Sequence, residues 1–313
     1  MARRIIIDCD PGHDDAIAIL LAHGDPGLEL AAITTVAGTQ TLDKTTLNAR
    51  RVCTAAGIQD VPVAAGSEGP LLRPLVTAGH IHGRSGLDGP AWPEPEVPLS
   101  PVHAVDLVVD LVMSSPGEIT LVPTGPLTNI ALAVRKEPRI VSRVREVVLM
   151  GGSFTRGNHT PAAEFNAMVD PEAAQIVFEA GWPLTMVGLD LTHQARATPA
   201  VMERIEALGT PVSLVVLSML RFYGDRYRAE GLGASPPVHD PCAVARVADP
   251  DVMRCREAFV AVETVGRWSY GMTVTEFRSG RGHAFNAQVA TDLDFDRFWD
   301  LVIAALARIG DPA

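Results

Sequence analysis

The sequence lacks long apolar runs and any excess of basic residues. No stretch approaches the roughly 18 consecutive apolar residues of a membrane-spanning helix, so we expect no transmembrane segment. Lysine and arginine number 26 against 37 aspartate and glutamate residues, which gives a formal net charge of -11. Binding to nucleic acid or to an anionic membrane surface normally needs a basic face, so we expect neither kind of partner.

Cysteine is also scarce. The four cysteines show no CxxC pairing, and they are Cys9, Cys53, Cys242 and Cys255. We interpret them as reduced thiols of a cytoplasmic protein. The N-terminus runs directly into the apolar residues 5–7, without the longer apolar region and small-residue cleavage site of a signal peptide. This pattern also favours a cytoplasmic location.

Apolar strands alternate with helices through the first 190 residues. Strands are predicted at 3–9, 28–36, 61–65, 118–122, 144–150 and 184–187. Helices are predicted at 14–23, 42–56, 102–114, 127–136 and 171–180. This order predicts an α/β fold with an open, mostly parallel central sheet and helices on both faces, similar to a Rossmann fold.

The C-terminal portion is predicted to be more helical. Helices are expected at 200–208, 212–228, 241–247 and 295–309, and two strands, expected to be antiparallel, at 259–265 and 271–276. No repeat and no linker divides the chain, so we predict a single domain over residues 1–313. The Gly- and Pro-rich segments 66–101 and 151–161 interrupt the order. Loops at the carboxyl ends of parallel strands form ligand crevices, so we expect these segments to be functional.

The most informative feature is a cluster of acids directly after the first apolar strand. Asp8, Asp10, Asp14 and Asp15 place four carboxylates within eight residues. Like charges this close repel unless they take up protons or share a cation, and carboxylate oxygens suit a hard divalent metal. Asp8 and Asp10, two apart in an extended strand, are expected to share a face. Asp14 and Asp15 have the simpler alternative of complementing a helix dipole, which we rank second.

Three further segments carry polar groups, and each of these groups allows a structural or a functional interpretation. Thr124 follows a strand and opens a helix, either as an ordinary cap or as an exposed carbonyl. Glu164 and Asn166 are two apart in a loop that also contains Asn158, so they either meet solvent or hold a polyhydroxyl ligand. At a probable helix start, Asp240 is either an N-cap or a ligand, and His239 is either a surface residue or a proton donor.

Five sequence blocks together resemble the nucleoside hydrolases of the inosine-uridine preferring type. Residues 8–16, DCDPGHDDA, resemble the signature DxDPGxDDA of that family. The other blocks follow in family order: residues 34–38, 123–129, 164–166 and 238–241. The resemblance covers essentially the whole chain and implies the nucleoside hydrolase fold, ribonucleoside substrates and a homodimer or homotetramer.

The resemblance also implies residue roles. Calcium would be bound by the side chains of Asp10, Asp15 and Asp240 and by the main-chain carbonyl of Thr124, with the ribose diol completing the coordination. Asp8 would orient this site without contacting the ion. The ribose hydroxyls would be held by Asp14, Asn158, Glu164 and Asn166, with Met150 packed nearby. His239 would serve the departing base, and the base would be approached from mobile segments by His82 and by Tyr227 with Tyr223 or Arg226.

One position departs from the family pattern. The family usually has VAGN where this chain has Val36-Ala37-Gly38-Thr39. A hydroxyl replaces one hydrogen bond but not the donor and acceptor pair of an amide. We therefore expect Thr39, a substrate-binding position, to alter substrate affinity more than the type of reaction.

These residues suggest hydrolysis of the N-glycosidic bond of purine or pyrimidine ribonucleosides to ribose and free base. In this hypothesis calcium lowers the pKa of a bound water, and Asp10 accepts its proton as general base. Water attacks the anomeric carbon opposite the base, with inversion, through an oxocarbenium-like transition state that the carboxylates stabilise. His239, or a group from the mobile segments, assists the leaving base.

Two rival functions remain open at the level of sequence. A metal-dependent phosphohydrolase also carries Asp-x-Asp after an apolar strand, but it expects DxDGT, whereas Pro11-Gly12 follows here. A nucleoside- or ribose-binding protein without catalysis would keep the metal site. The complete set Asp10, Asp15, Asp240 and His239 argues against this second rival. The sequence does not fix the preferred nucleobase.

Overall fold

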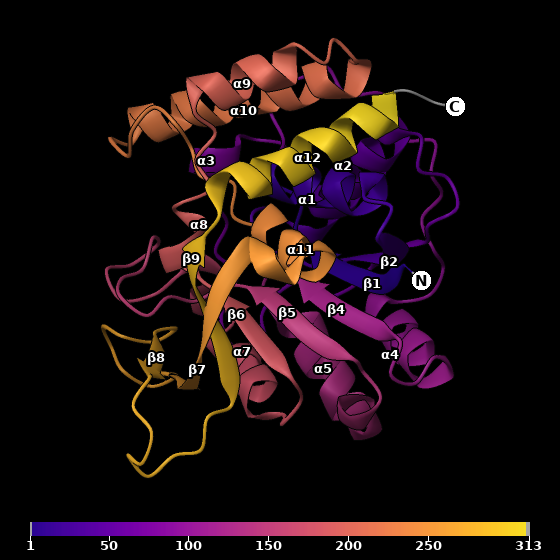
Figure 1. Ribbon diagram of the computed structural model, residues 1–313. Helices are drawn as coiled ribbons and strands as arrows, with labels where there is room; N and C mark the ends of the chain where they lie inside the picture. Colours follow the sequence, from indigo (N-terminus) through magenta and orange to yellow (C-terminus); the bar gives the residue numbers. More distant parts are fainter. Residues whose placement is uncertain (1, 311–313) are drawn as a thin grey trace.

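The alternation of apolar strands and amphipathic helices produces one nine-stranded sheet in the computed structural model, which describes residues 2–310 (Figure 1). The strand order is β3-β2-β1-β4-β5-β6-β9-β7-β8. In this spatial order, the strands from β3 through β9 pair in parallel with their neighbours. Strand β7 runs antiparallel to both of its neighbours, β9 and β8. The strands are β1 (Arg3–Cys9), β2 (Leu28–Thr35), β3 (Val63–Ala65), β4 (Ile119–Pro123), β5 (Glu146–Met150), β6 (Leu184–Val187), β7 (Met253–Val262), β8 (Thr273–Glu276) and β9 (Ala287–Leu293).

Helices cover both faces of the sheet. The α-helices are α1 (His13–Gly24), α2 (Leu42–Ala56), α3 (Gly79–His82), α4 (Ala104–Ser114), α5 (Thr128–Lys136), α6 (Phe165–Val169), α7 (Pro171–Glu179), α8 (Leu189–Thr192), α9 (Pro199–Glu206), α10 (Pro211–Ala229), α11 (Pro241–Ala248) and α12 (Phe295–Gly310). Two short 3-10 helices are η1 (Pro138–Ser142) and η2 (Pro250–Val252). Figure 1 shows α4, α5 and α7 on one side of the sheet and α1, α11 and α12 on the other. Among residues 2–310, no helix combines the length and the apolarity needed to cross a membrane.

Strand β1, in the interior of the sheet, contributes to both cores because successive side chains of a strand point to opposite faces. Ile5 and Ile7 lie in the core that contains α1, α11 and α12, whereas Ile6 lies in the core that contains α4, α5 and α7. All three are fully buried, as a parallel strand covered on both faces requires. Helix α1 is buried almost all round, because it lies under α11 and α12.

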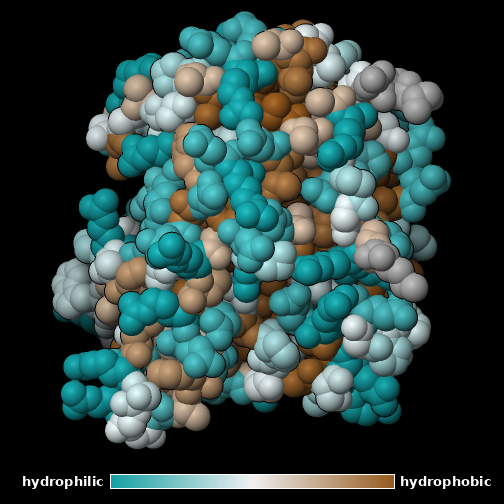
Figure 2. Space-filling model, viewed as in Figure 1, coloured by the Kyte–Doolittle hydropathy of each residue, from teal (hydrophilic) through white to brown (hydrophobic). Residues whose placement is uncertain are grey.

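The outer surface differs from these cores in hydropathy, as expected. Figure 2 shows hydrophilic residues over most of one face, with hydrophobic residues showing between them. The largest fully buried side chain, Trp299, belongs to α12 and packs in the core beneath this face with Phe298. The open α/β sheet predicted from the sequence is therefore confirmed.

The structure corrects the predicted elements in the C-terminal portion. Strand β9 was not predicted, because AQVATDL mixes polar and small residues, and it inserts in the sheet between β6 and β7. Strand β7 begins at Met253 and not at residue 259, since Arg254, Arg256 and Glu257 break its apolar pattern without breaking its pairing to β9. Its antiparallel pairing with β8 is confirmed. The long segment 66–101 contains the short helix α3.

The packing of α1 against α12 generates a stability prediction. A Cβ on Gly24, the last residue of α1, would collide with the main-chain carbonyl of Ala305 in α12. Gly24→Ala should therefore destabilise the fold by about 1–3 kcal/mol, despite the better helix propensity of alanine. Urea unfolding measures this change. Gly69→Ala is the matched control, because a Cβ there meets no atom within 4 Å; equal stability of the two variants would contradict the prediction.

Candidate active site

The site begins at the turn between β1 and α1. Strand β1 ends at Cys9 and α1 begins at His13, so only Asp10, Pro11 and Gly12 connect them. The amide of Gly12 donates to Asp15 Oδ2 at 3.0 Å, which satisfies one of the free amides at the helix start. Of the paired acids Asp14 and Asp15, Asp15 therefore does stabilise the start of α1. It uses one oxygen and leaves Oδ1 to accept from Thr124 Oγ1 at 2.8 Å.

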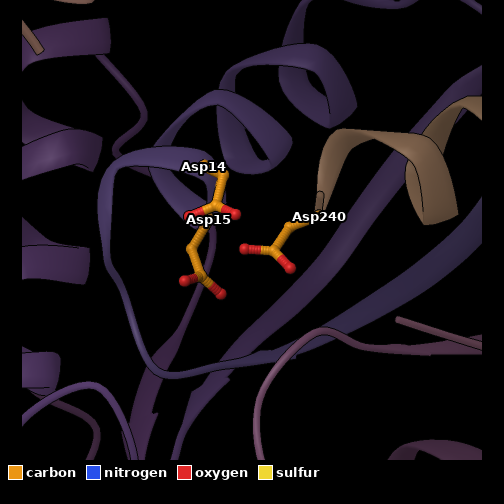
Figure 3. Close-up of side chains that lie close together, drawn as sticks. All are labelled: Asp14, Asp15 and Asp240. Atoms are coloured by element: carbon orange, nitrogen blue, oxygen red, sulfur yellow. The ribbon is translucent and has the colours of Figure 1, made fainter. Parts of the chain in front are cut away.

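Three carboxylates converge beside this turn. Asp14 and Asp15 come from the first turn of α1, and Asp240 precedes α11, which packs against α1. Figure 3 shows the Asp240 side chain pointing toward the other two. One oxygen from each lies within 4.8 Å of the others, and all three residues are buried. Residues 225 positions apart are also joined directly, because the amide of His239 donates to Asp14 Oδ2 at 3.3 Å.

Burial makes this arrangement electrostatically costly without a cation. Burial, and then the charge of Asp15, raise the pKa of Asp14 to about 7. Burial and the charges of Asp14, Asp15 and Asp10 hold the pKa of Asp240 well above its ordinary value. No lysine or arginine lies among the described residues that line the site. Buried oxygen donors with no protein cation fit a hard divalent metal ion.

Asp10 is held slightly apart from these three carboxylates. Its Oδ2 accepts from the amide of Thr39 at 2.6 Å, and its main-chain carbonyl accepts from the Thr39 hydroxyl. A side chain on Gly38 or Gly125 would collide with the Asp10 carboxylate, so both glycines allow main chain to approach it closely. Burial and the charge of Asp15 raise the pKa of Asp10 well above its ordinary value. The structure therefore gives Thr39 a contact with Asp10 that the sequence did not reveal.

Asp8 lies behind the site and does not line the cavity. Its Oδ1 accepts from Thr34 Oγ1 at 2.6 Å and from Asn129 Nδ2 at 2.8 Å. Its Oδ2 is buried with no partner among residues 2–310. Burial raises the pKa of Asp8 to about 6, and the two hydrogen bonds oppose this. Asp8 and Asp10 were expected to project the same way, but only Asp10 reaches the cavity, because the chain leaves the strand after Cys9.

The predicted ribose-binding residues form a second polar group opposite the turn. Asn166 Nδ2 donates to the main-chain carbonyls of Thr124 at 2.7 Å and Met150 at 3.2 Å. Glu164 is the N-cap of α6 and accepts from the amides of Asn166, Gly152 and Ala167 at 2.8–3.1 Å. Its carboxylate is thus fixed by backbone amides, and burial still raises its pKa. The carbonyl of Thr124 keeps a second lone pair for another partner.

These groups line one cavity of about 260 Å³. The cavity brings together all the predicted site residues except Asp8: Asp10, Asp14, Asp15, Thr39, His82, Thr124, Met150, Asn158, Glu164, Asn166, Tyr227, His239 and Asp240. Asn158 is exposed, so it stands at the rim. Of the two alternatives beside Tyr227, Tyr223 lines the cavity, whereas Arg226 is exposed and lies over the ring of Phe222.

Histidines and tyrosines form the opposite wall of the cavity. His239 Nδ1 lies 2.7 Å from Thr192 Oγ1, and its Nε2 lies 3.4 Å from the hydroxyl of Tyr227. His82, at the end of α3, stacks on Tyr223 with ring centroids 5.4 Å apart. Burial lowers the pKa of His239 to about 3 and that of His82 well below its usual range, so both rings are neutral near pH 7.

Sequence reasoning missed three residues of this site. Thr192 contacts His239, Asn129 contacts Asp8, and His13 contacts His82. His13 and Asn129 stand inside the recognised sequence blocks, so their position was a usable signal. Thr192 follows β6 in the short helix α8, and no spacing in the sequence connects it to His239.

An open α/β sheet with buried acids at the carboxyl ends of its strands defines a class of enzyme with a polar, metal-competent ligand site. Comparison with known proteins makes the class specific. The family model of the inosine-uridine preferring nucleoside hydrolases matches residues 5–300. The chain belongs to this family, and it is a ribonucleoside hydrolase, an N-glycosyl hydrolase.

Individual relatives agree with this assignment. The inosine-uridine preferring nucleoside hydrolase of Crithidia fasciculata is 55% identical over 314 aligned residues, covering 100% of both chains. The pyrimidine-specific ribonucleoside hydrolase RihA of Enterobacter sp. (strain 638) is 45% identical over 98% of this chain and 99% of that protein. The purine-preferring ribonucleoside hydrolase of Gardnerella vaginalis superposes with a TM-score of 0.92 at 30% identity, covering 98% of this chain and 99% of that chain.

The raised carboxyl pKa values predict how stability depends on pH. A carboxyl whose pKa rises from 3.8 to about 7 on folding, as for Asp14, binds its proton more tightly in the folded state. Its contribution to stability is therefore complete below about pH 4 and is lost as the pH rises toward 7. In the presence of a chelator, this carboxyl contribution to the melting temperature should fall between pH 5 and pH 8, whereas the buried His82 and His239, whose pKa values are lowered, contribute stability that rises over the same range.

A divalent cation that binds the ionised carboxylates of the folded state should oppose the loss of the carboxyl contribution. At a concentration 100-fold above its Kd, a ligand stabilises by about 2.7 kcal/mol, so the gain in melting temperature should be larger at pH 8 than at pH 5. Differential scanning calorimetry measures both trends. Asp240→Asn should weaken both, since it removes one charge. A pH trend of the chelated protein that is the same in Asp240→Asn as in the wild type would contradict the interpretation.

Proposed function

We propose that this enzyme hydrolyses the N-glycosidic bond of purine and pyrimidine ribonucleosides in a calcium-dependent reaction that gives ribose and the free base. The observation that carries the proposal is the convergence of Asp14, Asp15 and Asp240, all buried, in a cavity whose described lining has no lysine or arginine. Membership of the nucleoside hydrolase family supplies the reaction type. The identity of the metal and the roles of individual residues are our proposals.

The proposed calcium ligands are the side chains of Asp10, Asp15 and Asp240 and the main-chain carbonyl of Thr124. All are oxygen donors, which Ca²⁺ prefers. An oxygen of Asp14 also lies within 4.8 Å of oxygens of Asp15 and Asp240, so we place Asp14 at the border between metal and ribose. When bound, the ion would make a water molecule more acidic and hold the sugar hydroxyls. The buried, unpartnered Oδ2 of Asp8 adds negative charge beside the same site.

Asp10 is the proposed general base. The amide of Thr39 holds its Oδ2 at 2.6 Å, so the carboxylate has one fixed orientation from which Oδ1 can accept a proton. A bound cation would offset the burial that raises its pKa and would keep the carboxylate ionised, ready to accept a proton. Removal of a proton from water lets the oxygen attack the anomeric carbon, with inversion, because no protein nucleophile intervenes.

The sugar is proposed to bind between the carboxylates and the amides. Ribose hydroxyls both donate and accept, so they suit the acceptors Asp14 and Glu164 together with the amides Asn166 and Asn158. As the bond to the base breaks, positive charge develops on the sugar ring. The buried carboxylates then stabilise this charge in a site from which bulk water is largely excluded.

His239 is the proposed hydrogen-bond donor to the departing base. Thr192 Oγ1 is buried, and its partner among residues 2–310 is His239 Nδ1. An undonated hydroxyl would leave a buried donor unsatisfied, so Thr192 donates and His239 Nδ1 accepts. The neutral ring therefore carries its proton on Nε2, on the side of Tyr227. His239 can thus donate to a base atom without first becoming an imidazolium.

The two alternative functions receive less support from this site. A phosphohydrolase must bind a phosphate dianion, and the described lining offers six acidic residues but no lysine or arginine. A binding protein without catalysis would not need an oriented base and an oriented donor in the same cavity. We find both in Asp10 and His239.

We also propose a single domain over residues 1–313, because one sheet draws strands from the whole chain. The four free cysteines, three of them buried, support a cytoplasmic location. A homodimer or homotetramer is proposed from the family resemblance. The exposed Val265 and Trp268, between β7 and β8, offer apolar surface for such a contact.

A panel of purine and pyrimidine ribonucleosides, assayed for reducing sugar with and without a chelator, tests the proposed function. We expect hydrolysis of inosine and uridine that the chelator abolishes and Ca²⁺ restores. Asp10→Ala should reduce kcat by more than about tenfold while the protein stays folded. Tight nucleoside binding without sugar release would identify a binding protein, and phosphate release from phosphomonoesters would identify a phosphohydrolase.

The leaving-group role of His239 generates a separate prediction. His239→Ala should lower kcat for inosine and uridine by about 10²–10⁴-fold, and less for p-nitrophenyl riboside, whose leaving group needs no donor. Thr192→Val keeps the volume but frees the tautomer of His239, so it should lower kcat for nucleosides by roughly tenfold. Steady-state kinetics on all three substrates measure these effects.

Thr120→Val provides the matched control for this experiment. The Thr120 hydroxyl in β4 is also buried, but it has no partner among residues 2–310. The same substitution there should leave the kinetics close to those of the wild type. Equal losses for His239→Ala on nucleosides and on p-nitrophenyl riboside would remove the leaving-group role.

A further inference from the structure

A row of side chains along α2 faces the segment that follows α3. Gln40, Lys44 and Asn48 are four positions apart, so they share one side of α2 and of the residues that lead into it. Each side chain donates to one of the three successive main-chain carbonyls of residues 83–85. The distances are 3.1 Å for Gln40 Nε2, 2.8 Å for Lys44 Nζ and 2.9 Å for Asn48 Nδ2. The function described above gives this α2 row no role.

Two contacts fix the orientation of the Gln40 amide. Its Oε1 lies 3.2 Å from Lys44 Nζ, which can only donate. Its Nε2 faces the carbonyl oxygen of Gly83, which can only accept. The reversed amide would set two donors against each other at one end and two acceptors at the other. Lys44 therefore supports Gln40 and also holds the carbonyl of Arg84 directly.

The segment held by the α2 row is a compact turn with contacts of its own. The carboxylate of Asp88 accepts from the amides of Arg84 at 2.9 Å and Ser85 at 3.1 Å. Gly83 and Gly86 have φ angles of 84° and 85°, in the left-handed region that glycine adopts without strain. The turn therefore does not need α2 for its shape. The α2 row determines where this turn lies against the rest of the protein.

The turn continues directly from a segment that lines the cavity. Four of the residues 78–82 line the cavity, and we call this segment the α3 wall. One end of the α3 wall is tied to Thr39, because the amide of Ala78 donates to the Thr39 carbonyl at 3.0 Å. The other end is tied to α2 through the turn 83–85. Asn48 also donates to the carbonyl of Pro11 at 3.0 Å, so the row connects the α3 wall to the β1–α1 turn.

The chain uses lysine at very few positions. Lysine and arginine together number 26, and only Lys44 and Lys136 are lysines. An ammonium group can direct separate N–H bonds to separate acceptors, here Gln40 Oε1 and the Arg84 carbonyl. Lys136 belongs to α5 and forms a surface ion pair with Asp106, on the face of the sheet opposite to α1. Lys136 is therefore a matched control for Lys44.

We propose that Gln40, Lys44 and Asn48 are positioning residues that hold the α3 wall in place before a substrate binds. The kinetic consequence rests on the proposed function, whereas the positioning itself does not. A wall that is already ordered lets the nucleoside bind without a further loss of conformational freedom. The α2 row acts through the α3 wall and touches no reacting atom. Its loss should therefore raise KM and leave kcat nearly unchanged.

Limited proteolysis with trypsin provides the first test, which does not depend on activity. Trypsin cleaves after Arg84, whose side chain is exposed and whose carbonyl accepts the Lys44 bond. In Lys44→Met, loss of this bond should raise the population in which the turn leaves α2 by roughly two- to tenfold. Cleavage after Arg84 should accelerate by the same factor, as measured by mass spectrometry of the fragments. Lys136→Met should leave this rate unchanged.

Steady-state kinetics provide the second test. The double variant Gln40→Leu/Lys44→Met removes two of the three bonds to the turn. It should raise KM for inosine by roughly tenfold, with kcat within about twofold of the wild type. Lys44→Arg keeps the charge and the N–H donors, so its cleavage rate and KM should stay within about threefold of the wild type. Lys136→Met is again the control.

The outcomes separate the possible causes. Equal cleavage rates in Lys44→Met and the wild type, or a Lys44→Arg variant that is cleaved as fast as Lys44→Met, would overturn the proposal. A loss in kcat as large as the rise in KM would also overturn it, because the chemistry would then be distorted. If the wild type hydrolysed no nucleoside, the proposed function would fail, and the cleavage rates would still decide whether the α2 row holds the turn. The melting temperature of each variant separates local opening from global unfolding.

Discussion

Buried negative charge without a protein cation is the constraint on which the rest of this structure depends. Asp14, Asp15 and Asp240 converge from two helices, and Asp10 lies beside them. Burial alone would drive such groups to take up protons, because ionised carboxylates lose their hydration in the interior. A divalent cation resolves the repulsion and keeps the carboxylates ionised. The same charges then suit a reaction in which a sugar ring becomes positive.

The two hydrophobic cores make this costly arrangement possible. Strand β1 is buried on both faces, and α1 is covered by α11 and α12, so the turn between β1 and α1 has little freedom to relax. Asp240 reaches the site because α11 packs against α1. The carboxylates are therefore held together by packing that extends well beyond the site itself.

Main chain that closely approaches side chains of the site positions these side chains. Gly38 and Gly125 let backbone approach the Asp10 carboxylate, and Gly12 leaves room for the His82 ring. The amide of Thr39 then orients the Asp10 carboxylate, while the Thr39 hydroxyl donates to the main-chain carbonyl of Asp10. This contact explains why threonine is compatible with the site at a position where the family usually has asparagine. It leaves Asp10, the proposed general base, oriented, whatever the effect on substrate affinity.

The sequence by itself determined the open α/β class, the family and the acidic turn. The turn could be predicted because a buried strand, a Pro-Gly turn and a helix start are local features, and together they bring Asp10, Asp14 and Asp15 close to one another. It missed β9 and the start of β7, whose pairing depends on neighbouring strands and not on an apolar pattern. Only the tertiary structure decided that Asp8 turns away from the cavity, that Arg226 stays outside it, and that Thr192 and His13 contact His239 and His82. These contacts join residues 47 and 69 positions apart, and no local pattern encodes them, since they arise when separate loops pack at one edge of the sheet.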